Sequence, residues 1–210
     1  MPVDPTLDRE QAMFAAGASV VIGLDEVGRG AMAGPVMVGA CAITASVGNF
    51  PDGLRDSKLV SEKKRLALDP LVREWGVIAV GAASPQEIDQ YGITFSLGLA
   101  GKRALALLFE AGVPVGDAQL ILDGSHDWLS PALASPLPIT TAVKADQNCA
   151  SVAAASVAAK VERDALMAVL AEDFAEFGWA SNKGYGSADH MRLLAEQGPT
   201  VHHRVTWVKK

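Results

Sequence analysis

The segment from Val20 to Gly30 constrains the fold of this chain most strongly, because an apolar run ends there in two adjacent carboxylates. The run Val20-Val21-Ile22-Gly23-Leu24 is rich in β-branched residues and fits no helical period, so it predicts a buried strand. Successive strand side chains point to opposite faces, which separates Asp25 from Glu26. Charges at the end of a core strand are costly unless compensated, and a divalent cation compensates clustered carboxylates well. The Gly28-Arg29-Gly30 turn then adds backbone that a ligand can approach closely.

Two further acids stand at the boundaries of predicted elements. Asp123 directly follows the apolar run Leu120-Ile121-Leu122, and strand ends are where α/β folds place their chemistry. An Asp-Gly pair is also common in ordinary turns, so spacing alone leaves both interpretations of Asp123 open. Asp146 precedes a long predicted helix whose small residues would let it lie close to a sheet. An aspartate in that place is equally typical of a helix cap.

The order of the predicted elements indicates an α/β domain with a mixed sheet. Three strands come first and can pair antiparallel, and two later strands need helical crossovers. Ser84-Pro85-Gln86-Glu87 is a strong helix start, with a serine cap, then proline, then glutamate at the third position. The predicted strands cover about residues 18–26, 34–44, 76–83, 120–122 and 138–143. The predicted helices cover about residues 61–73, 84–91, 94–111, 148–177 and 187–198.

Composition excludes several classes of protein. Half of the 210 residues are hydrophobic, and no apolar run approaches the roughly 18 residues needed to cross a membrane. The start of the chain lacks the basic residues and apolar centre of a secretory signal. Cys41 and Cys149 are interpreted as small core residues of a cytosolic protein, without a disulfide. The net charge of −6 argues against nucleic-acid binding through bulk positive charge, unless carboxylate-bound cations supply positive charge where phosphate would lie.

The chain resembles type 2 ribonuclease H, the bacterial ribonuclease HII family, in three blocks. These are Asp-Glu-Val-Gly-Arg-Gly with a Gly-Pro pair shortly after it, the strand-ending Asp123-Gly124, and Lys144-Ala145-Asp146 with the Ala-rich segment up to Arg163-Asp164. The resemblance covers about residues 18–207. It implies a ribonuclease H-like fold, in which a five-stranded mixed sheet is flanked by helices and followed by a C-terminal helical extension. Residues 18–210 would form this domain, and residues 1–17 an N-terminal extension.

The resemblance also implies a catalytic centre that holds two divalent ions, Mg²⁺ or Mn²⁺. It would hydrolyse the RNA strand of RNA–DNA hybrids and nick duplex DNA 5′ of an embedded ribonucleotide, leaving 5′-phosphate and 3′-hydroxyl ends. Zinc is disfavoured, because the two cysteines lie far apart with no histidine at ligand spacing. The residues that carry the reaction and bind the metal would be Asp25, Glu26, Asp123 and Asp146.

Substrate contacts follow from the same resemblance. The backbone of Gly28, Arg29 and Gly30 would contact the 2′-hydroxyl that distinguishes RNA from DNA. Tyr185, which stands between two glycines, would pack on the sugar of the next nucleotide, and the alternative is an ordinary loop aromatic. Backbone phosphates would be contacted by Lys58, Lys160 and Arg163, although a solvated lysine is equally plausible at the first two positions.

We expect a cytoplasmic monomer that acts on RNA–DNA hybrids and on ribonucleotide-containing duplex DNA, as in ribonucleotide excision repair, and that binds no membrane. His202-His203 is not spaced for a shared metal and is interpreted as a surface pair or a C-terminal phosphate contact.

Three alternatives to a type 2 enzyme compete with this interpretation. A dinucleotide-binding enzyme is suggested by Gly28-Arg29-Gly30-Ala31-Met32-Ala33, but that motif needs a helix next, and Pro35 with the following Val and Ile residues favours a strand. A non-catalytic nucleic-acid-binding module of the same fold would be indicated by the loss of one acid, and all four are present. A type 3 ribonuclease H would carry an additional N-terminal substrate-binding domain, and only about 17 residues precede the first predicted strand.

Overall fold

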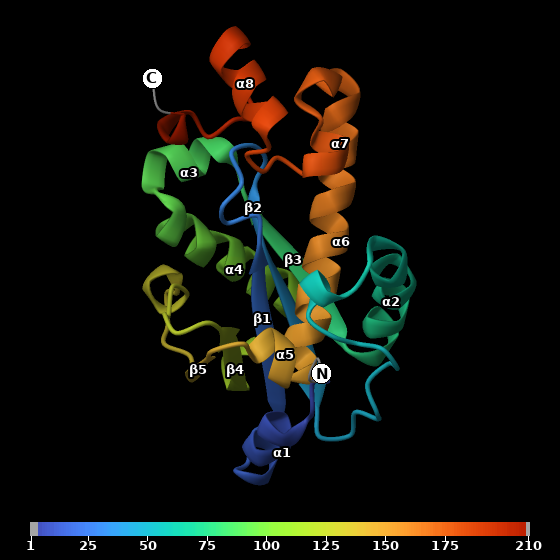
Figure 1. The fold of residues 1–210 in the computed structure, drawn as a ribbon. Coiled ribbons are helices and arrows are strands. Elements are labelled where there is room, and N and C mark those ends of the chain that lie inside the picture. The colour runs from blue at the N-terminus through green and yellow to red at the C-terminus, as the bar shows by residue number, and fades with distance from the viewer. Residues whose placement is uncertain (1–3, 209–210) are drawn as a thin grey trace.

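The computed structural model describes residues 4–208, and this part of the chain contains one five-stranded mixed sheet (Figure 1). Its strands are β1 (Val20–Val27), β2 (Val36–Thr44), β3 (Val77–Ala83), β4 (Ala118–Asp123) and β5 (Ile139–Ala142). The spatial order is β3-β2-β1-β4-β5. β1 pairs antiparallel with β2 and parallel with β4, while β2–β3 is antiparallel and β4–β5 parallel. The predicted α/β class with a mixed five-stranded sheet is therefore confirmed.

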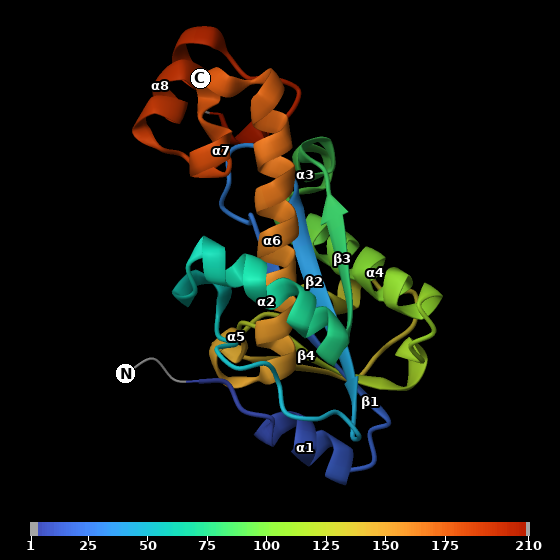
Figure 2. The same cartoon turned by 90° about the vertical axis from the view of Figure 1, so that its right-hand side faces the viewer.

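Helices cover both faces of this sheet. The longer ones are α2 (Glu62–Trp75), α4 (Ile93–Glu110), α6 (Ala150–Asp173) and α8 (Ala188–Gln197), and the shorter ones are α1 (Asp8–Ala15), α3 (Pro85–Tyr91), α5 (Ala145–Asn148) and α7 (Trp179–Asn182). Figure 2 shows α6 and α2 in front of the sheet and α4 behind it. Helices α7 and α8 lie together at one end of the molecule, in agreement with the predicted C-terminal helical extension (Figure 1). None of the helices within residues 4–208 is long and apolar enough to cross a bilayer.

The alternation of β1 divides the core into two layers. Ile22 and Leu24 pack in the cluster that includes Leu97 of α4. Val21 packs in the cluster on the other face, which includes Val152 of α6. A strand buried on both faces reads as a continuous apolar run, which explains the pattern in the sequence.

Helix α6 lies unusually close to the sheet. A Cβ atom on Gly23 of β1 would collide with the backbone of Ser151, and one on Gly39 of β2 would collide with the carbonyl of Ala155. The alanines in the first part of α6, from Ala150 to Ala159, are buried, as their small size predicted. The depth of α6 therefore depends on glycine in the sheet and alanine in the helix.

The structure differs from the prediction at the start and end of this long helix. The predicted segment 148–177 is shorter, because α6 ends at Asp173 and begins only at Ala150. Cys149 has extended backbone, with φ −119° and ψ 123°, since it forms a β-bridge with Thr6. The four-residue helix α5 is thereby separated from α6.

Other predictions from the sequence are met. The capping box at Ser84 is present: the backbone N–H of Glu87 donates to the Ser84 side chain, and the Glu87 side chain accepts from the backbone N–H of Ser84. Cys41 and Cys149 are buried free thiols. The turn after β1 leads into β2 rather than a helix, which excludes the dinucleotide-binding alternative.

Helix α1 was not predicted, and it is attached to the core by a buried carboxylate. Oε1 of Glu10 accepts hydrogen bonds from the backbone N–H of Ser151 at 2.9 Å and from its hydroxyl at 2.7 Å. The N–H groups in the first turn of a helix lack intrahelical acceptors, and a negative charge there is favourable. Oε2 of Glu10 is buried without a partner among the described residues, so desolvation offsets part of this stabilisation.

Replacing Glu10 tests this capping contact. We expect Glu10→Ala to lower the free energy of unfolding by about 1–3 kcal/mol, because two buried donors of Ser151 lose their acceptor. Urea denaturation measures the change. The matched control is Glu172→Ala at an exposed position of α6, which should shift the value by less than about 0.5 kcal/mol. Equal losses in the two variants would contradict the capping role.

The C-terminal helices enclose a hydrogen-bonded pair of histidines. His190 Nδ1 lies 2.8 Å from the carbonyl of Tyr185, so Nδ1 carries the proton and donates it. His203 Nδ1 accepts from the backbone N–H of Thr200 at 2.9 Å, which leaves the His203 proton on Nε2. That Nε2 donates to Nε2 of His190 at 2.9 Å. Both rings are neutral in this arrangement, and they join the Tyr185 loop to the C-terminal segment.

The interpretation of His202-His203 as a surface pair or phosphate contact is wrong for His203. Its ring is 1% exposed and packs edge-on against the rings of Phe177 and Trp179. Aromatic side chains from a segment more than 20 residues away cover it. The sequence around His203 alone therefore does not predict this contact.

This burial predicts a pH-dependent stability. Burial lowers the pKa of His203 from 6.5 to about 4, and the neighbouring His190 and His202 act in the same direction. Between these two pKa values the folded chain binds fewer protons than the unfolded chain, so the stabilisation present above pH 6.5 is lost as the pH falls toward 4. The loss is at most a few kcal/mol, because each pKa unit corresponds to about 1.4 kcal/mol.

We therefore expect the free energy of unfolding to fall more steeply between pH 7 and pH 5 in the wild type than in His203→Gln. Chemical denaturation at each pH measures both slopes. His126→Gln, at an exposed histidine, should keep the wild-type slope. The assignment fails if the wild type and His203→Gln respond to pH alike.

Candidate metal centre and substrate groove

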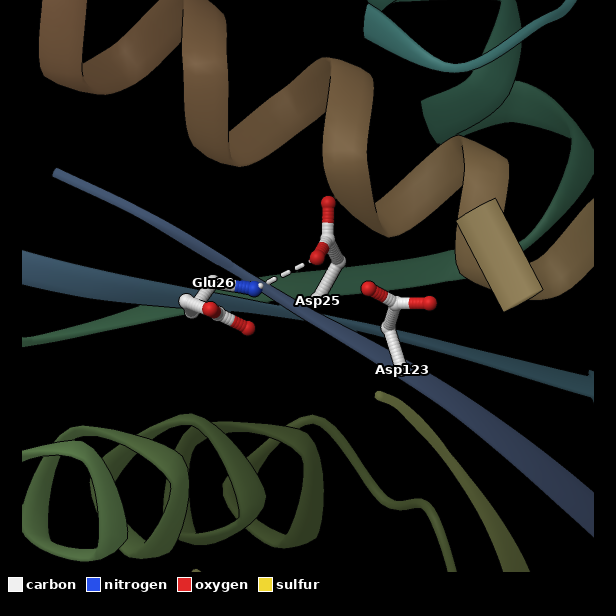
Figure 3. Close-up of side chains that lie close together, drawn as sticks. All are labelled: Asp25, Glu26 and Asp123. Carbon is white, nitrogen blue, oxygen red and sulfur yellow. Dashed lines mark hydrogen bonds between the residues drawn. The ribbon is translucent and has the colours of Figure 1, made fainter. Parts of the chain in front are cut away.

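Three carboxylates meet where the pairing of β1 with β4 stops (Figure 3). The parallel register pairs Leu24 with Leu122, so the next residues, Asp25 within β1 and Asp123 at the end of β4, lie at the same level. Asp25, Glu26 and Asp123 each offer an oxygen within 4.8 Å of those of the other two. The expectation that acids at strand ends converge holds for these three residues.

Asp25 is the most enclosed member of this cluster. Its side chain points toward α6 (Figure 3), and the residue is 3% exposed. Oδ1 accepts the backbone N–H of Glu26 at 2.8 Å. Burial raises the pKa of Asp25 well above its usual range, the Ser156 hydroxyl of α6 opposes this, and the charges of Glu26 and Asp123 raise the pKa further.

The donor set fits a hard divalent cation. Three carboxylates at this spacing repel one another, and a bound cation would remove that repulsion. Ligands made only of oxygen suit Mg²⁺, Mn²⁺ or Ca²⁺ rather than Zn²⁺, which favours nitrogen and sulfur. Neither buried thiol belongs to the cluster.

Asp146 lies beside the cluster rather than among its three converging oxygens. Its carboxylate is 4% exposed, and Oδ2 lies 3.7 Å from Nζ of Lys58. Burial, together with the charges of Asp123 and Asp56, raises the pKa of Asp146 to about 6. The backbone N–H of Ala145 donates to Oδ1 of Asp123 at 2.7 Å, which joins α5 to the end of β4.

Asp56 begins the Asp-Ser-Lys segment that resembles a phosphate-contacting segment of the family, in which the predicted contact belongs to Lys58. Asp56 is 3% exposed, and its carboxylate accepts the backbone N–H of Lys58 at 2.9 Å and the Gln147 amide at 3.2 Å. These bonds join the turn that carries Lys58 to α5. The Asp-Ser-Lys sequence contains the Asx-turn signal for the first bond, whereas the second depends on tertiary contact.

The predicted substrate-binding residues line one groove of about 390 Å³ beside Glu26. Its walls include Gly28, Arg29, Gly30, Lys58, Lys160 and Tyr185. Both lysines have a carboxylate neighbour: Nζ of Lys58 lies 3.7 Å from Asp146, and Nζ of Lys160 lies 2.6 Å from Asp164. The side chain of Lys58 is 69% exposed and that of Lys160 is 17% exposed, so Lys58 is the more accessible of the two.

The prediction of a phosphate contact for Arg163 is wrong. Its side chain is fully buried, and the guanidinium donates to the carbonyls of Ala33, Pro35 and Lys183. Lys160 and Arg163 lie one turn apart along α6, and of the two only Lys160 lines the groove.

Comparisons with known proteins agree with this geometry. The family model described as Ribonuclease HII matches residues 22–210. Ribonuclease HII of Streptomyces griseus subsp. griseus is 48% identical over 213 residues, covering 99% of this chain and 86% of the relative. Ribonuclease HII of Ruegeria sp. is 40% identical over 200 residues, covering 95% of this chain and 82% of the relative.

Solved structures share the fold. The ribonuclease H2 from Pyrococcus horikoshii aligns with a TM-score of 0.70 and 24% identity, over 90% of this chain and 93% of that chain. Bst-RNase HIII in complex with Mn²⁺ aligns with a TM-score of 0.73 and 23% identity, over 93% of this chain and 69% of that chain. The ribonuclease H-like fold is therefore shown.

Replacing Asp25 tests the metal centre without reference to any reaction. We expect Asp25→Asn to unfold at the same or a higher temperature than the wild type without metal, because repulsion within the cluster is reduced. Mn²⁺ at 100 times its dissociation constant should stabilise the wild type by about 2.7 kcal/mol and the variant much less. Thermal denaturation across a Mn²⁺ titration measures this. Asp117→Asn, at an exposed position before β4, should respond as the wild type does; an equal response of Asp25→Asn would rule out its role as a ligand.

Proposed function

Because the chain belongs to the ribonuclease HII family, we propose that the groove beside Glu26 binds RNA-containing duplexes and that the adjoining carboxylates carry phosphodiester hydrolysis. As a member of this family the protein is a ribonuclease H, a hydrolase that acts on RNA–DNA hybrids and uses divalent metal ions. The observation that carries the proposal is the convergence of Asp25, Glu26 and Asp123 beside the groove, of which Glu26 forms part of the wall.

The proposed catalytic residues are Asp25, Glu26, Asp123 and Asp146, which would hold two Mg²⁺ or Mn²⁺ ions. When bound, such ions supply an activated water and stabilise the charge on the departing 3′ oxygen. The protein contributes rigid ligands: Asp25 is held by the N–H of Glu26, and Asp123 by the N–H of Ala145. Preorganised ligands avoid reorganisation during the reaction.

The 2′-hydroxyl acts in this proposal as a recognition group and not as the nucleophile. No histidine lines the groove among the described residues, and His190 and His203 are engaged with one another elsewhere. An acid–base ribonuclease would need such a pair at the scissile phosphate. Water attack would therefore leave a 5′-phosphate and a 3′-hydroxyl.

Substrate recognition is assigned to the two sides of the groove. The backbone of Gly28, Arg29 and Gly30 contacts the ribose 2′-hydroxyl, and Tyr185, which is 39% exposed, packs on the next sugar. Lys58 is exposed and contacts phosphate directly. Lys160 is less exposed and forms the shorter ion pair, 2.6 Å with Asp164 against 3.7 Å between Lys58 and Asp146, so its contribution to phosphate binding is smaller.

We also propose that the protein is a cytoplasmic monomer that nicks duplex DNA 5′ of embedded ribonucleotides, the first step of their excision. The division into an N-terminal extension of residues 1–17 and a domain of residues 18–210 belongs to the same proposal. Packing of Glu10 against α6 supports a structural role for the extension.

The deciding experiment is cleavage of duplex DNA that carries one ribonucleotide, in Mg²⁺ or Mn²⁺. We expect a metal-dependent nick on the 5′ side of the ribonucleotide. Asp123→Asn should reduce the rate at least about a hundredfold, the factor for losing about 2.7 kcal/mol of transition-state stabilisation. Asp117→Asn should cleave at the wild-type rate.

Other outcomes of this experiment redirect the proposal. Cleavage of long RNA–DNA hybrids without cleavage at a single ribonucleotide would replace type 2 specificity by that of type 1 or type 3 enzymes. No cleavage of either substrate by the folded, metal-loaded protein would leave a non-catalytic nucleic-acid-binding module as the better account.

A further inference from the structure

Two arginines are fully buried without a carboxylate partner. The side chains of Arg163 and Arg204 are both 0% exposed. Among the described residues, no carboxylate oxygen lies within 4.0 Å of either guanidinium, the distance limit for an ion pair. Burying an unpaired charge is costly, and desolvation lowers the pKa of both groups. The desolvation cost of these two guanidiniums must be offset by the interactions that they make.

Both guanidiniums bind backbone carbonyls of the turn between β1 and β2. Arg204 donates to the carbonyls of Gly28 at 2.6 Å, Arg29 at 2.7 Å and Gly34 at 3.1 Å. Arg163 donates to the carbonyls of Ala33 at 3.1 Å and Pro35 at 3.0 Å. Five carbonyls of one turn are therefore held by side chains from distant segments.

The hydrogen bonds to these carbonyls determine where the N–H groups of the same peptide units point. In a trans peptide the C=O and the N–H of the same unit point in opposite directions, and the described chain contains no cis bond. Because Arg204 holds the carbonyls of Gly28 and Arg29, the N–H groups of Arg29 and Gly30 point away from the buried guanidinium. Neither N–H has a hydrogen-bond acceptor among the described residues, and both residues line the groove.

Arg163 connects this turn to the other side of the groove. Its guanidinium lies over the Tyr185 ring, 5.5 Å from the ring centre, and donates to the carbonyl of Lys183 at 2.9 Å. Gly28 has φ +79°, and a Cβ atom there would collide with the Arg163 side chain. The spacing between the turn and Tyr185 is therefore set through one buried side chain.

We propose that Arg204 and Arg163 are positioning residues that determine specificity for ribose: Arg204 aims the N–H groups of Arg29 and Gly30 at the 2′-hydroxyl, and Arg163 sets Tyr185 at the matching distance. This inference rests on the proposed function of the groove. It assigns discrimination between ribose and deoxyribose to two side chains that touch no substrate.

Arginine is required here for its shape. A guanidinium presents five N–H donors in a planar fork, whereas a lysine ammonium is a compact donor on a flexible stem. Arg204 uses Nη1 and Nη2 on different carbonyls at once. A lysine would keep the charge and lose the simultaneous hold on two peptide units.

The test compares the affinity for a duplex with one ribonucleotide and for the same duplex of DNA alone. All proteins carry Asp123→Asn to prevent cleavage, and fluorescence anisotropy measures both dissociation constants. We expect Arg204→Lys to reduce the preference for the ribonucleotide about tenfold, equivalent to about 1.4 kcal/mol, with the affinity for DNA unchanged. Arg163→Lys should reduce the same preference. Arg192→Lys, on the exposed face of α8, should leave it unchanged.

The results distinguish a failure of the proposed groove function from a failure of the positioning role of the arginines. If the parent protein shows no preference for the ribonucleotide, the proposed recognition by the groove is wrong. If the parent shows the preference and folded Arg204→Lys keeps it, the positioning role is wrong. Thermal denaturation with and without Mn²⁺, at intact Asp123, should show normal metal stabilisation of Arg204→Lys, which separates lost specificity from a damaged metal centre. Should Arg204→Lys not fold, retention of the preference by folded Arg163→Lys would overturn the proposal.

Discussion

The close approach of α6 to β1 and β2 is the constraint on which the remaining features depend. It requires glycine at positions 23 and 39, since any side chain there would collide with the helix backbone. Once α6 lies at this depth, its residues reach fixed places: Ser156 lies beside Asp25, Lys160 lines the groove and Arg163 lies under the turn between β1 and β2. Spacings of four and three residues keep all three on one side of the helix.

Both parts of the site retain groups that are unfavourable for stability. The metal centre holds carboxylates that repel one another, with Asp25 buried. The turn between β1 and β2 is held by buried arginines that have only carbonyl acceptors. A bound cation would relieve the repulsion among the carboxylates, whereas the arginines would act on a substrate only through the turn that they hold. The negative net charge of the chain is thus consistent with binding a polyanion through a metal.

Anchoring from outside the site makes this arrangement rigid. Glu10 caps the start of α6, next to the helix that carries Asp146. At the far end, the histidine pair joins the Tyr185 loop to the segment that contains Arg204. The N-terminal segment is thus attached to the start of α6 and the C-terminal segment to the Tyr185 loop, and neither contributes a carboxylate to the cluster of three.

The local sequence determined the five strands and the longer helices, and it marked Asp25, Glu26 and Asp123 as candidate site residues. The apolar run before Asp25 and the one before Asp123 specify buried strands that end in charge, and parallel neighbours end at one edge. Pattern and spacing carry this information because strand alternation and chain direction are local properties. Only the tertiary structure decided that Arg163 and His203 are buried, that Asp56 joins α5, and that Arg204 holds the turn 176 residues before it. Burial and partner choice depend on which distant segments pack together, and no local pattern encodes that contact.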